Sequence, residues 1–300
     1  MSEDKEILLE KVRELEKTKK LHTDPTSDNT ARILNEKRRF SAPLSEAEAR
    51  KKMSGKSRRG FLVGAAAALT GIFGWRWMSD ETKQSLVRRT FEFNEKVAQV
   101  FYRPSRLSPE FPPERISLPP RVNGFAGLSE GFDPASWTLS VGGLANRIDD
   151  LVLTLDQIKA LPRTEMTTEL KCVEGWSIIV NWAGVRFSDF AAVYLPQTID
   201  GSVPDIINHP ENLVPYVSMV TPDQAYYVGW DMPSILHPQT LLAYEINGQP
   251  LPLEHGAPLR LASPTKYGIK LIKRIGRIEF SADRPKDYWA EQGYDWYSGH

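Results

Sequence analysis

The pattern of apolar and polar positions divides the chain into four stretches. Residues 1–57 are rich in charged side chains and poor in large apolar ones, which is typical of a solvated tail. Residues 60–75 are almost wholly apolar. Residues 80–100 repeat apolar positions near helical spacing, which predicts a helix. From residue 123 onward, short apolar runs alternate with turn residues, which indicates a folded domain of mixed strands and short helices.

The folded region predicts strands joined by tight turns. Alternating or apolar runs bounded by turn residues indicate the strands, and Asn247-Gly248 is a strong signal for a hairpin turn. The pattern contains no parallel strand–helix–strand repeats, so we expect an α+β fold with mixed sheets instead of a doubly wound sheet. The expected strands are 137–141, 177–182, 241–246, 259–262 and 277–280, and a short helix is expected over 153–161.

Proline dominates the stretch before this domain. It recurs at positions 104, 109, 112, 113, 119 and 120. Proline blocks helices and favours extended chain. We therefore expect a connector that follows the predicted helix and lies over the surface of a domain without forming a domain itself.

The apolar run at residues 60–75 resembles an export signal or membrane anchor. Arg58-Arg59 directly precedes it, as in a twin-arginine signal, and Trp75 and Trp77 suit a membrane interface. The run is shorter than the roughly 20 residues of an upright span, and no small-residue cleavage site follows it. We expect an uncleaved inner-membrane anchor with the basic side cytoplasmic and the folded domain periplasmic. The alternative is a buried Ala-rich core helix.

Charge and cysteine content narrow the classes of function. Lys+Arg and Asp+Glu are equal at 38 each, so net charge gives no case for nucleic-acid binding. The single cysteine excludes an internal disulfide and a cysteine-rich zinc or iron–sulfur site. That residue, Cys172, is followed by Gly175 and stands between two predicted strands, which favours a loop position. Taken alone, a lone cysteine is more often a small buried apolar residue.

A second group of candidate residues lies between positions 255 and 274. Turn-forming Gly and Pro residues alternate there with basic side chains, and no acid interrupts them until Glu279. Clustered Lys and Arg with exposed backbone amides suit a phosphate, while a solvated basic strand edge is the structural alternative. The basic and titratable members are His255, Arg260, Lys266, Lys270, Lys273 and Arg274.

Both groups fall within motifs that resemble the sulfite oxidase superfamily of molybdopterin-binding oxidoreductases. The motifs occur in the family's order and cover roughly residues 123–288. Within that family, the short architecture resembles the catalytic subunit of periplasmic methionine sulfoxide reductases. The motifs are CVEGWS at 172–177, WAGV at 182–185, LLAYE at 241–245, NG at 247–248, HGAPLRL at 255–261 and KYG at 266–268.

The resemblance implies a molybdenum centre held by one pyranopterin dithiolene and one cysteine thiolate. Cys172 takes the ligand position, and a soft thiolate suits such a metal. Glu174 is a candidate proton relay, with a surface carboxylate as the alternative. Tyr227, beside Tyr226, is a candidate for the substrate pocket, with core or rim packing as the alternative. The cofactor-binding positions implied are Asn123, Thr221, His255, Arg260, Leu271, Ile272 and Lys273.

The resemblance also sets the expected organisation and partners. We expect a charged cytoplasmic tail at 1–57, a twin-arginine-like signal or anchor at 58–78, a helix and connector at 79–120, and the molybdopterin-binding domain at 121–300. The sequence has no haem-attachment motif, so a membrane haem subunit is the expected electron partner. His255 stands where the methionine sulfoxide reductases have Asn. The expected substrate therefore stays broad: a small or protein-bound S- or N-oxide, or a sulfite-like anion, in two-electron oxygen-atom transfer.

Two other functions remain open from the residues alone. Cys172 is a candidate nucleophile of a transferase or hydrolase, with His209, His237 or His255 as its base. The basic cluster is equally consistent with a non-catalytic anchored module that binds an anionic partner.

Overall fold

The computed structural model describes residues 78–103, 105–122, 124 and 126–299. The described residues divide into two units, one ending at Asn94 and the other beginning at Glu95. The expected tail, and all but the last residue of the expected anchor at 58–78, lie outside the described residues. No helix in the described part of the chain is long and apolar enough to cross a membrane.

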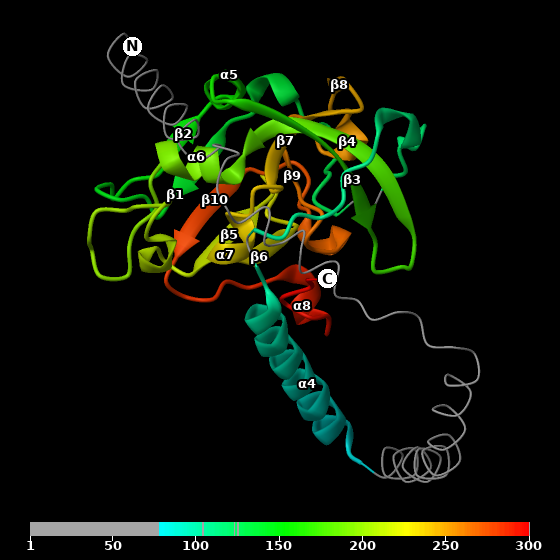
Figure 1. Ribbon diagram of the computed structural model, residues 1–300, viewed down its shortest axis with the longest axis vertical. Helices are drawn as coiled ribbons and strands as arrows, with labels where there is room; N and C mark the ends of the chain where they lie inside the picture. Colours follow the sequence, from blue (N-terminus) through cyan, green and yellow to red (C-terminus); the bar gives the residue numbers. More distant parts are fainter. Residues whose placement is uncertain (1–77, 104, 123, 125, 300) are drawn as a thin grey trace, which may run out of the picture. The chain divides into compact units, whose positions relative to one another are not determined.

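The helix expected over residues 80–100 is α4 (Asp80–Phe101), drawn in Figure 1. Acidic side chains at Asp80 and Glu81 face the positive end of the helix dipole. The Lys83 ammonium lies 3.0 Å from the Asp80 carboxylate one turn earlier. Local charge therefore stabilises the first turn of this helix.

Two five-stranded sheets form the body of the second unit. The first has the order β2-β1-β10-β5-β6, in which only β1 and β10 run parallel. Its strands are β1 (Leu139–Gly142), β2 (Leu151–Leu153), β5 (Tyr216–Val220), β6 (Tyr227–Asp231) and β10 (Arg277–Ser281).

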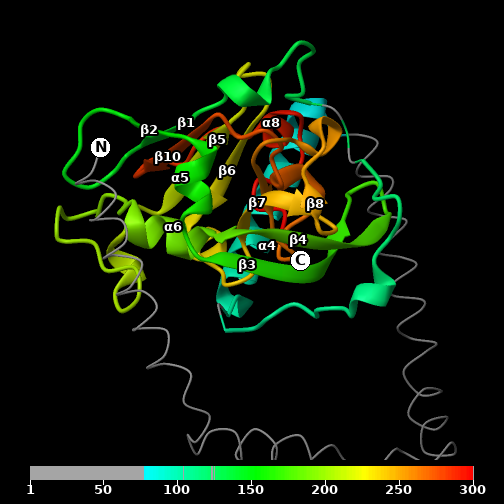
Figure 2. The same cartoon turned by 90° about the horizontal axis from the view of Figure 1, so that it is seen from above.

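The second sheet is antiparallel and has the order β3-β4-β7-β8, with β9 also paired to β7. Figure 2 shows β3 and β4 running together as a long ribbon apart from the strands of the first sheet. The strands are β3 (Arg163–Lys171), β4 (Ser177–Arg186), β7 (Leu241–Ile246), β8 (Gln249–Pro250) and β9 (Arg260–Ala262).

Short helices connect the strands. The Thr154 side chain accepts from the Gln157 backbone N–H while the Gln157 side chain accepts from the Thr154 N–H, which closes a capping box at the start of α5. The α-helices are α5 (Leu155–Lys159), α6 (Phe187–Val193), α7 (Met232–Ile235) and α8 (Tyr288–Glu291), and the 3-10 turns are η2 (Pro113–Arg115), η3 (Pro134–Ser136), η4 (Pro210–Asn212), η5 (Leu253–His255) and η6 (Gly268–Lys270).

One mixed sheet and one antiparallel sheet, joined by short helices, confirm the expected α+β class. All five expected strands and the short helix after residue 153 are present, with ends displaced by a few residues. Asn247 and Gly248 both have positive φ, 50° and 75°, in the turn between β7 and β8. The prediction missed β2, β3, β5, β6 and β8.

The proline-rich connector lies along the second sheet. The Phe111 N–H donates to the Thr167 carbonyl of β3, and the Ser117 N–H donates to the Ile179 carbonyl of β4, each at 2.9 Å. Isolated hydrogen bonds of this kind satisfy the polar groups of an extended backbone without forming a regular strand.

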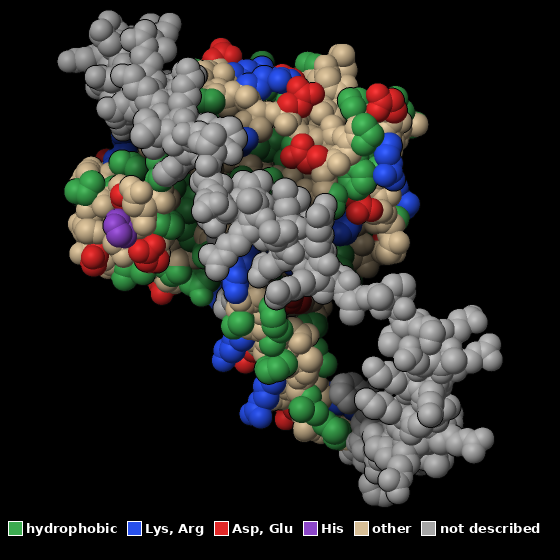
Figure 3. Space-filling model, viewed as in Figure 1, with side chains coloured by type: hydrophobic (Ala, Val, Ile, Leu, Met, Phe, Trp, Pro, Cys, Tyr) green, Lys and Arg blue, Asp and Glu red, His purple; other side chains and the backbone are tan. Residues whose placement is uncertain are grey.

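On the coloured part of the face in Figure 3, basic and acidic side chains are interspersed, in keeping with the balanced charge.

Candidate functional site

The loop between β3 and β4 holds Cys172 at the end of a hairpin. The Cys172 N–H donates to the Trp176 carbonyl at 2.9 Å, and the Gly175 N–H donates to the Cys172 carbonyl at 3.1 Å. Gly175 has a φ of 85°, in the region that favours glycine, which lets this turn close. Cys172 is half-buried. Its expected loop position between two strands is confirmed.

A cavity of about 330 Å³ opens beside this loop. Cys172 and Glu174 line it from the loop, and Leu271 and Lys273 line it from the segment after β9. Residues far apart in the chain therefore meet at one site. The other lining residues are Arg121, Val122, Gly124, Ala126, Val173, Trp176, Tyr226, Gly268, Ile269, Trp289 and Tyr294.

Lys273 brings positive charge to the cavity wall. Its Nζ donates to the Gly124 carbonyl at 2.7 Å and to the Glu254 carbonyl at 2.9 Å. Burial, followed by the nearby Arg260 cation, lowers the pKa of Lys273 to about 7. An anion such as a phosphate at this wall would favour the ammonium and raise that pKa, so the side chain suits an anionic group.

Arg260 and His255 lie behind this wall. The fully buried Arg260 guanidinium donates to the carbonyls of His255 at 3.0 Å and Leu271 at 3.3 Å, and stacks on Trp182 at 4.6 Å. Burial lowers the pKa of Arg260 to about 9. Burial, followed by the Arg260 and Lys273 cations, lowers the pKa of His255 to about 4, so His255 is neutral at pH 7. Arg260 therefore fixes the backbone of a cavity residue.

Glu174 is exposed and is held by a neighbour in the same loop. The Trp176 indole N–H donates to its Oε2 at 2.8 Å. The Arg121 guanidinium lies over the Trp176 ring at 4.3 Å, which connects this loop to the segment around residue 122. A carboxylate in this position is within the cavity and open to water, as a proton relay requires.

Other residues singled out in the sequence lie elsewhere. Thr221 is buried, accepts from the Tyr226 N–H at 3.1 Å and donates to Asp223 at 2.6 Å. The Tyr227 hydroxyl binds Glu291, and Tyr226 lines the cavity in place of Tyr227. Ile272 is fully buried, and its carbonyl accepts from Leu261. Asn123 lies outside the described residues.

Several lining residues were not predicted. Arg121 lies two residues before Asn123, a predicted cofactor-binding position, and that proximity was a usable signal. Trp289 and Tyr294 come from the C-terminal stretch, where the density of aromatic residues was the only signal. Their approach to Cys172 depends on long-range packing, which a residue pattern does not encode locally.

The site brings a thiol and a cation together in one cavity, and comparison with known proteins gives the family of the chain. The model of the oxidoreductase molybdopterin binding domain matches residues 126–289. The chain belongs to this family, within the sulfite oxidase superfamily. It is therefore a molybdenum-dependent oxidoreductase, and its cofactor is molybdenum-molybdopterin.

The chain is similar to proteins named for methionine sulfoxide reduction. YedZ1 of Azospira oryzae, provisionally named a protein-methionine-sulfoxide reductase subunit, is 34% identical over 81% of this chain and 88% of its own length. The catalytic subunit MsrP of that reductase from Xanthomonas axonopodis pv. citri is 35% identical over 51% of this chain. The match covers 47% of MsrP, so the chain spans about half the length of that relative.

The comparison with solved structures gives a partial match. The sulfane dehydrogenase SoxCD from Paracoccus pantotrophus matches with a TM-score of 0.41 and 20% identity, over 51% of this chain and 40% of that chain.

The residues at the cavity fit the cofactor. A half-buried thiol and a buried lysine line the same cavity, which provides a soft metal donor and a cation for a phosphate. Within the described ranges, no cluster of three or more His, Cys, Asp or Glu could hold a metal ion.

Proposed function

We propose that this protein reduces S-oxides, with methionine sulfoxide as the substrate class, and that Cys172 is the protein ligand to molybdenum. The names of the similar proteins support the substrate class. The overall reaction is R₂S=O + 2 H⁺ + 2 e⁻ → R₂S + H₂O, with electrons from a separate carrier. When bound, the molybdenum centre supplies the two-electron oxygen-atom transfer.

The chain's own residues have distinct parts in this proposal. Cys172 binds the metal through its thiolate. Lys273 holds the anionic end of the cofactor, while Arg260 positions the Leu271 backbone beside it. Glu174 delivers a proton at the open side of the cavity, where water reaches it. Trp289 and Tyr294 form an aromatic wall of the same cavity.

The observation that carries the proposal is the meeting of Cys172 and Lys273 in one cavity. These residues come from a hairpin loop and from a segment beyond β9. A site for a phosphate-bearing metal cofactor needs both a metal donor and a cation within the reach of one molecule. The Cys172 cavity, by which we mean the 330 Å³ cavity described above, provides both.

The test is the metal content and activity of protein from a host that makes the cofactor. We expect molybdenum and pterin in the purified protein, and reduction of methionine sulfoxide. Cys172→Ser removes turnover by at least about 10³-fold while the circular dichroism spectrum stays unchanged. Val152→Ala, at an exposed position on β2, is the control and keeps full activity.

Two results would overturn the proposal. Retained turnover in Cys172→Ser would remove the ligand role. Oxidation of sulfite without reduction of methionine sulfoxide or trimethylamine N-oxide would remove the substrate class and direction while leaving the family unchanged. Parallel assays of these three compounds separate the outcomes.

The nucleophilic-cysteine alternative is not favoured. It needs a histidine beside the Cys172 thiol. Among the described residues that line the Cys172 cavity there is no histidine. His237 bonds the Arg106 carbonyl, and His209 pairs with Glu211. Membership of an oxidoreductase family likewise disfavours a non-catalytic anion-binding module.

We also propose an inner-membrane location with the folded domain on the periplasmic side and a membrane haem protein as electron partner. The sequence of Arg58-Arg59 before the apolar run at 60–75 supports this location. If Arg58 and Arg59 are both replaced by Lys, the protein should stay in the cytoplasmic fraction. A chain starting at Asp80 should lose its membrane association, and persistent partitioning into membranes would contradict the anchor.

A further inference from the structure

A second cavity lies apart from the residues that line the Cys172 cavity. Its volume is about 560 Å³, and it shares no lining residue with the Cys172 cavity. Lys171 lines the second cavity, and the next residue, Cys172, lines the first. Successive side chains at a strand end point to opposite sides, so the two cavities flank the same stretch of backbone.

Basic side chains dominate the charge of this second cavity. Its charged lining residues are Arg103, Arg106 and Lys171, and none of its described lining residues is Asp or Glu. Arg103 donates to the Val100 and Tyr102 carbonyls at the end of α4, each at 2.9 Å. Lys171 is 3.9 Å from Glu169, a distance that gives a weak, solvent-screened contact.

Of the three basic residues that line the second cavity, Arg106 is the one whose charge is available to bind a ligand. Within the described residues, its guanidinium takes part in no ion pair, while its backbone is fixed. The Arg106 N–H donates to the Arg103 carbonyl at 2.9 Å, and the His237 Nε2 donates to the Arg106 carbonyl at 3.2 Å. His237 is held in this tautomer because its Nδ1 accepts from the Gln239 N–H at 3.1 Å. The guanidinium therefore projects from a fixed segment.

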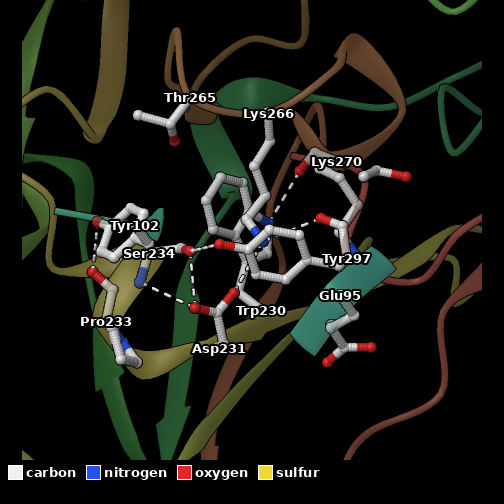
Figure 4. Close-up of polar contacts among 12 residues, drawn as sticks. Glu95, Tyr102, Trp230, Asp231, Pro233, Ser234, Thr265, Lys266, Lys270 and Tyr297 are labelled. Carbon is white, nitrogen blue, oxygen red and sulfur yellow. Dashed lines mark hydrogen bonds and ion pairs between the residues drawn. The ribbon is translucent and has the colours of Figure 1, made fainter. Parts of the chain in front are cut away.

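The hydroxyl groups of Ser234 and Tyr297 line the second cavity, next to a buried ion pair. Figure 4 shows Lys266 bound to Asp231, and Ser234 between Asp231 and Tyr297. Ser234 donates to Asp231 at 2.6 Å, whereas its contact with the Tyr297 hydroxyl is long, at 3.3 Å. Burial, followed by Asp231, raises the pKa of Tyr297 to about 12, so the phenol keeps its proton.

Large apolar side chains make up part of the remaining lining. Phe101 is 73% exposed and Leu107 is 57% exposed, and both line the cavity with the Tyr102 ring. Large apolar side chains that water reaches at a concave, basic site suit a ligand with a flat apolar body. We infer that this second cavity is a binding site for an aromatic organic anion, whose charge meets Arg106 and whose acceptor atom meets the Tyr297 hydroxyl.

The test uses holoenzyme, in which the cofactor fills its own site, and the fluorescent aromatic sulfonate 8-anilinonaphthalene-1-sulfonate. We expect one bound probe per chain. Arg106→Gln should weaken binding about tenfold, and Tyr297→Phe about fivefold, with unchanged thermal midpoints. Arg115→Gln is the matched control: Arg115 lies on the same connector but stacks on Phe111, and binding should not change.

Two comparison probes make the inference falsifiable. N-phenyl-1-naphthylamine has the same aromatic body without the sulfonate and should bind at least about tenfold more weakly. Inorganic phosphate should neither bind tightly nor displace the sulfonate. Equal binding of the neutral probe, effective competition by phosphate, or equal losses in the Arg115 and Arg106 variants would each overturn the inference. If Arg106→Gln does not fold, the Tyr297→Phe result decides alone.

Discussion

The lowered pKa of Lys273, which lines the Cys172 cavity, makes the stability of the fold depend on pH. Its pKa of about 7 in the folded protein lies below the ordinary value of 10.5. Between these values the unfolded chain binds the proton more tightly than the folded chain does. The lysine therefore destabilises the cofactor-free fold fully below pH 7, and this cost disappears as pH rises toward 10.5. A bound anion would remove the cost at neutral pH.

The first prediction follows from this linkage. For cofactor-free protein, the free energy of unfolding should rise between pH 7 and pH 9, and Lys273→Gln should reduce that rise. Lys270, with a pKa lowered to about 8 by burial, contributes equally to both proteins and cancels in the difference. Urea titrations at pH 7, 8 and 9 measure the effect. Parallel curves for the two proteins would contradict the assigned pKa shift.

The second prediction concerns Glu174. Glu174→Gln should lower kcat for methionine sulfoxide by about 10²-fold, because the amide cannot relay a proton. Its thermal midpoint should stay within about 2 °C, since the side chain is exposed. Steady-state kinetics across pH should show that the variant loses one titration of kcat. A rise in KM with unchanged kcat would instead assign Glu174 to binding.

The sequence predicted those residues of the candidate site whose side-chain chemistry alone indicates a role. Cys172, Glu174 and Lys273 were singled out in the sequence, and all three line one cavity. Tyr227 was preferred over Tyr226, but only the latter lines the cavity. Adjacent strand residues point to opposite faces, so a one-residue difference reverses the orientation. The pattern around these tyrosines did not fix which face was inward.

At the scale of elements, Gly184 allows β4 and β7 to approach closely. A Cβ at this position would lie 2.1 Å from the Leu242 carbonyl oxygen. The register between the two strands shifts at Ala183/Gly184, which marks a bulge. Any larger residue at position 184 would force β7 away from β4. The close approach helps align β7 with β9, which leads into the segment that lines the Cys172 cavity.

The third prediction tests this approach. Gly184→Ala should lower the free energy of unfolding by about 3 kcal/mol, because the new methyl group collides with rigid backbone. Gly201→Ala is the control, since a Cβ there meets nothing within 4 Å and adds only the strain of its φ of 73°. That control should cost about 1 kcal/mol. Equal losses in chemical denaturation would show that β7 moves aside to admit the methyl group and that the close approach is not rigid.

Elements were predictable where apolar periodicity was strong. The strand at 241–246 matches β7 residue for residue. β3 was missed because it contains Arg163, Glu165 and Glu169 and lacks a clear alternation. It lies at the edge of its sheet, where its polar side chains meet water. Its pairing with β4 along nine positions, not its own pattern, makes it a strand.

At the scale of the whole domain, two buried lysines hold the C-terminal segment. Lys266 pairs with Asp231 at 2.7 Å and donates to the Tyr297 carbonyl at 2.9 Å. Lys270 pairs with Asp287 at 2.5 Å and donates to the Trp296 carbonyl at 2.6 Å. These lysines were predicted only as part of a basic cluster. Their acidic partners lie far away in sequence, so the sequence did not reveal that the charges are paired and buried.

The fourth prediction concerns Asp287, the acidic partner of Lys270. Its carboxylate also accepts from the Gly229 N–H of β6 and from the Ala290 N–H at the start of α8. Asp287→Asn leaves the Lys270 ammonium buried without its counter-charge. We expect a loss of about 3–5 kcal/mol in the free energy of unfolding. Asp283→Asn, at an exposed position four residues earlier, is the control and should change stability by less than about 0.5 kcal/mol.

The same substitution should affect the Cys172 cavity, because the segment after Asp287 carries two of its aromatic residues, Trp289 and Tyr294. Below the unfolding temperature, Asp287→Asn should raise KM for methionine sulfoxide more than it lowers kcat, since the wall loosens while Cys172 stays in its hairpin. Hydrogen exchange should quicken in α8 and in residues 292–297 before it quickens in β3 and β4. If exchange rose uniformly across both sheets instead, the ion pair would support the whole fold, and the separate effect on KM should then be absent.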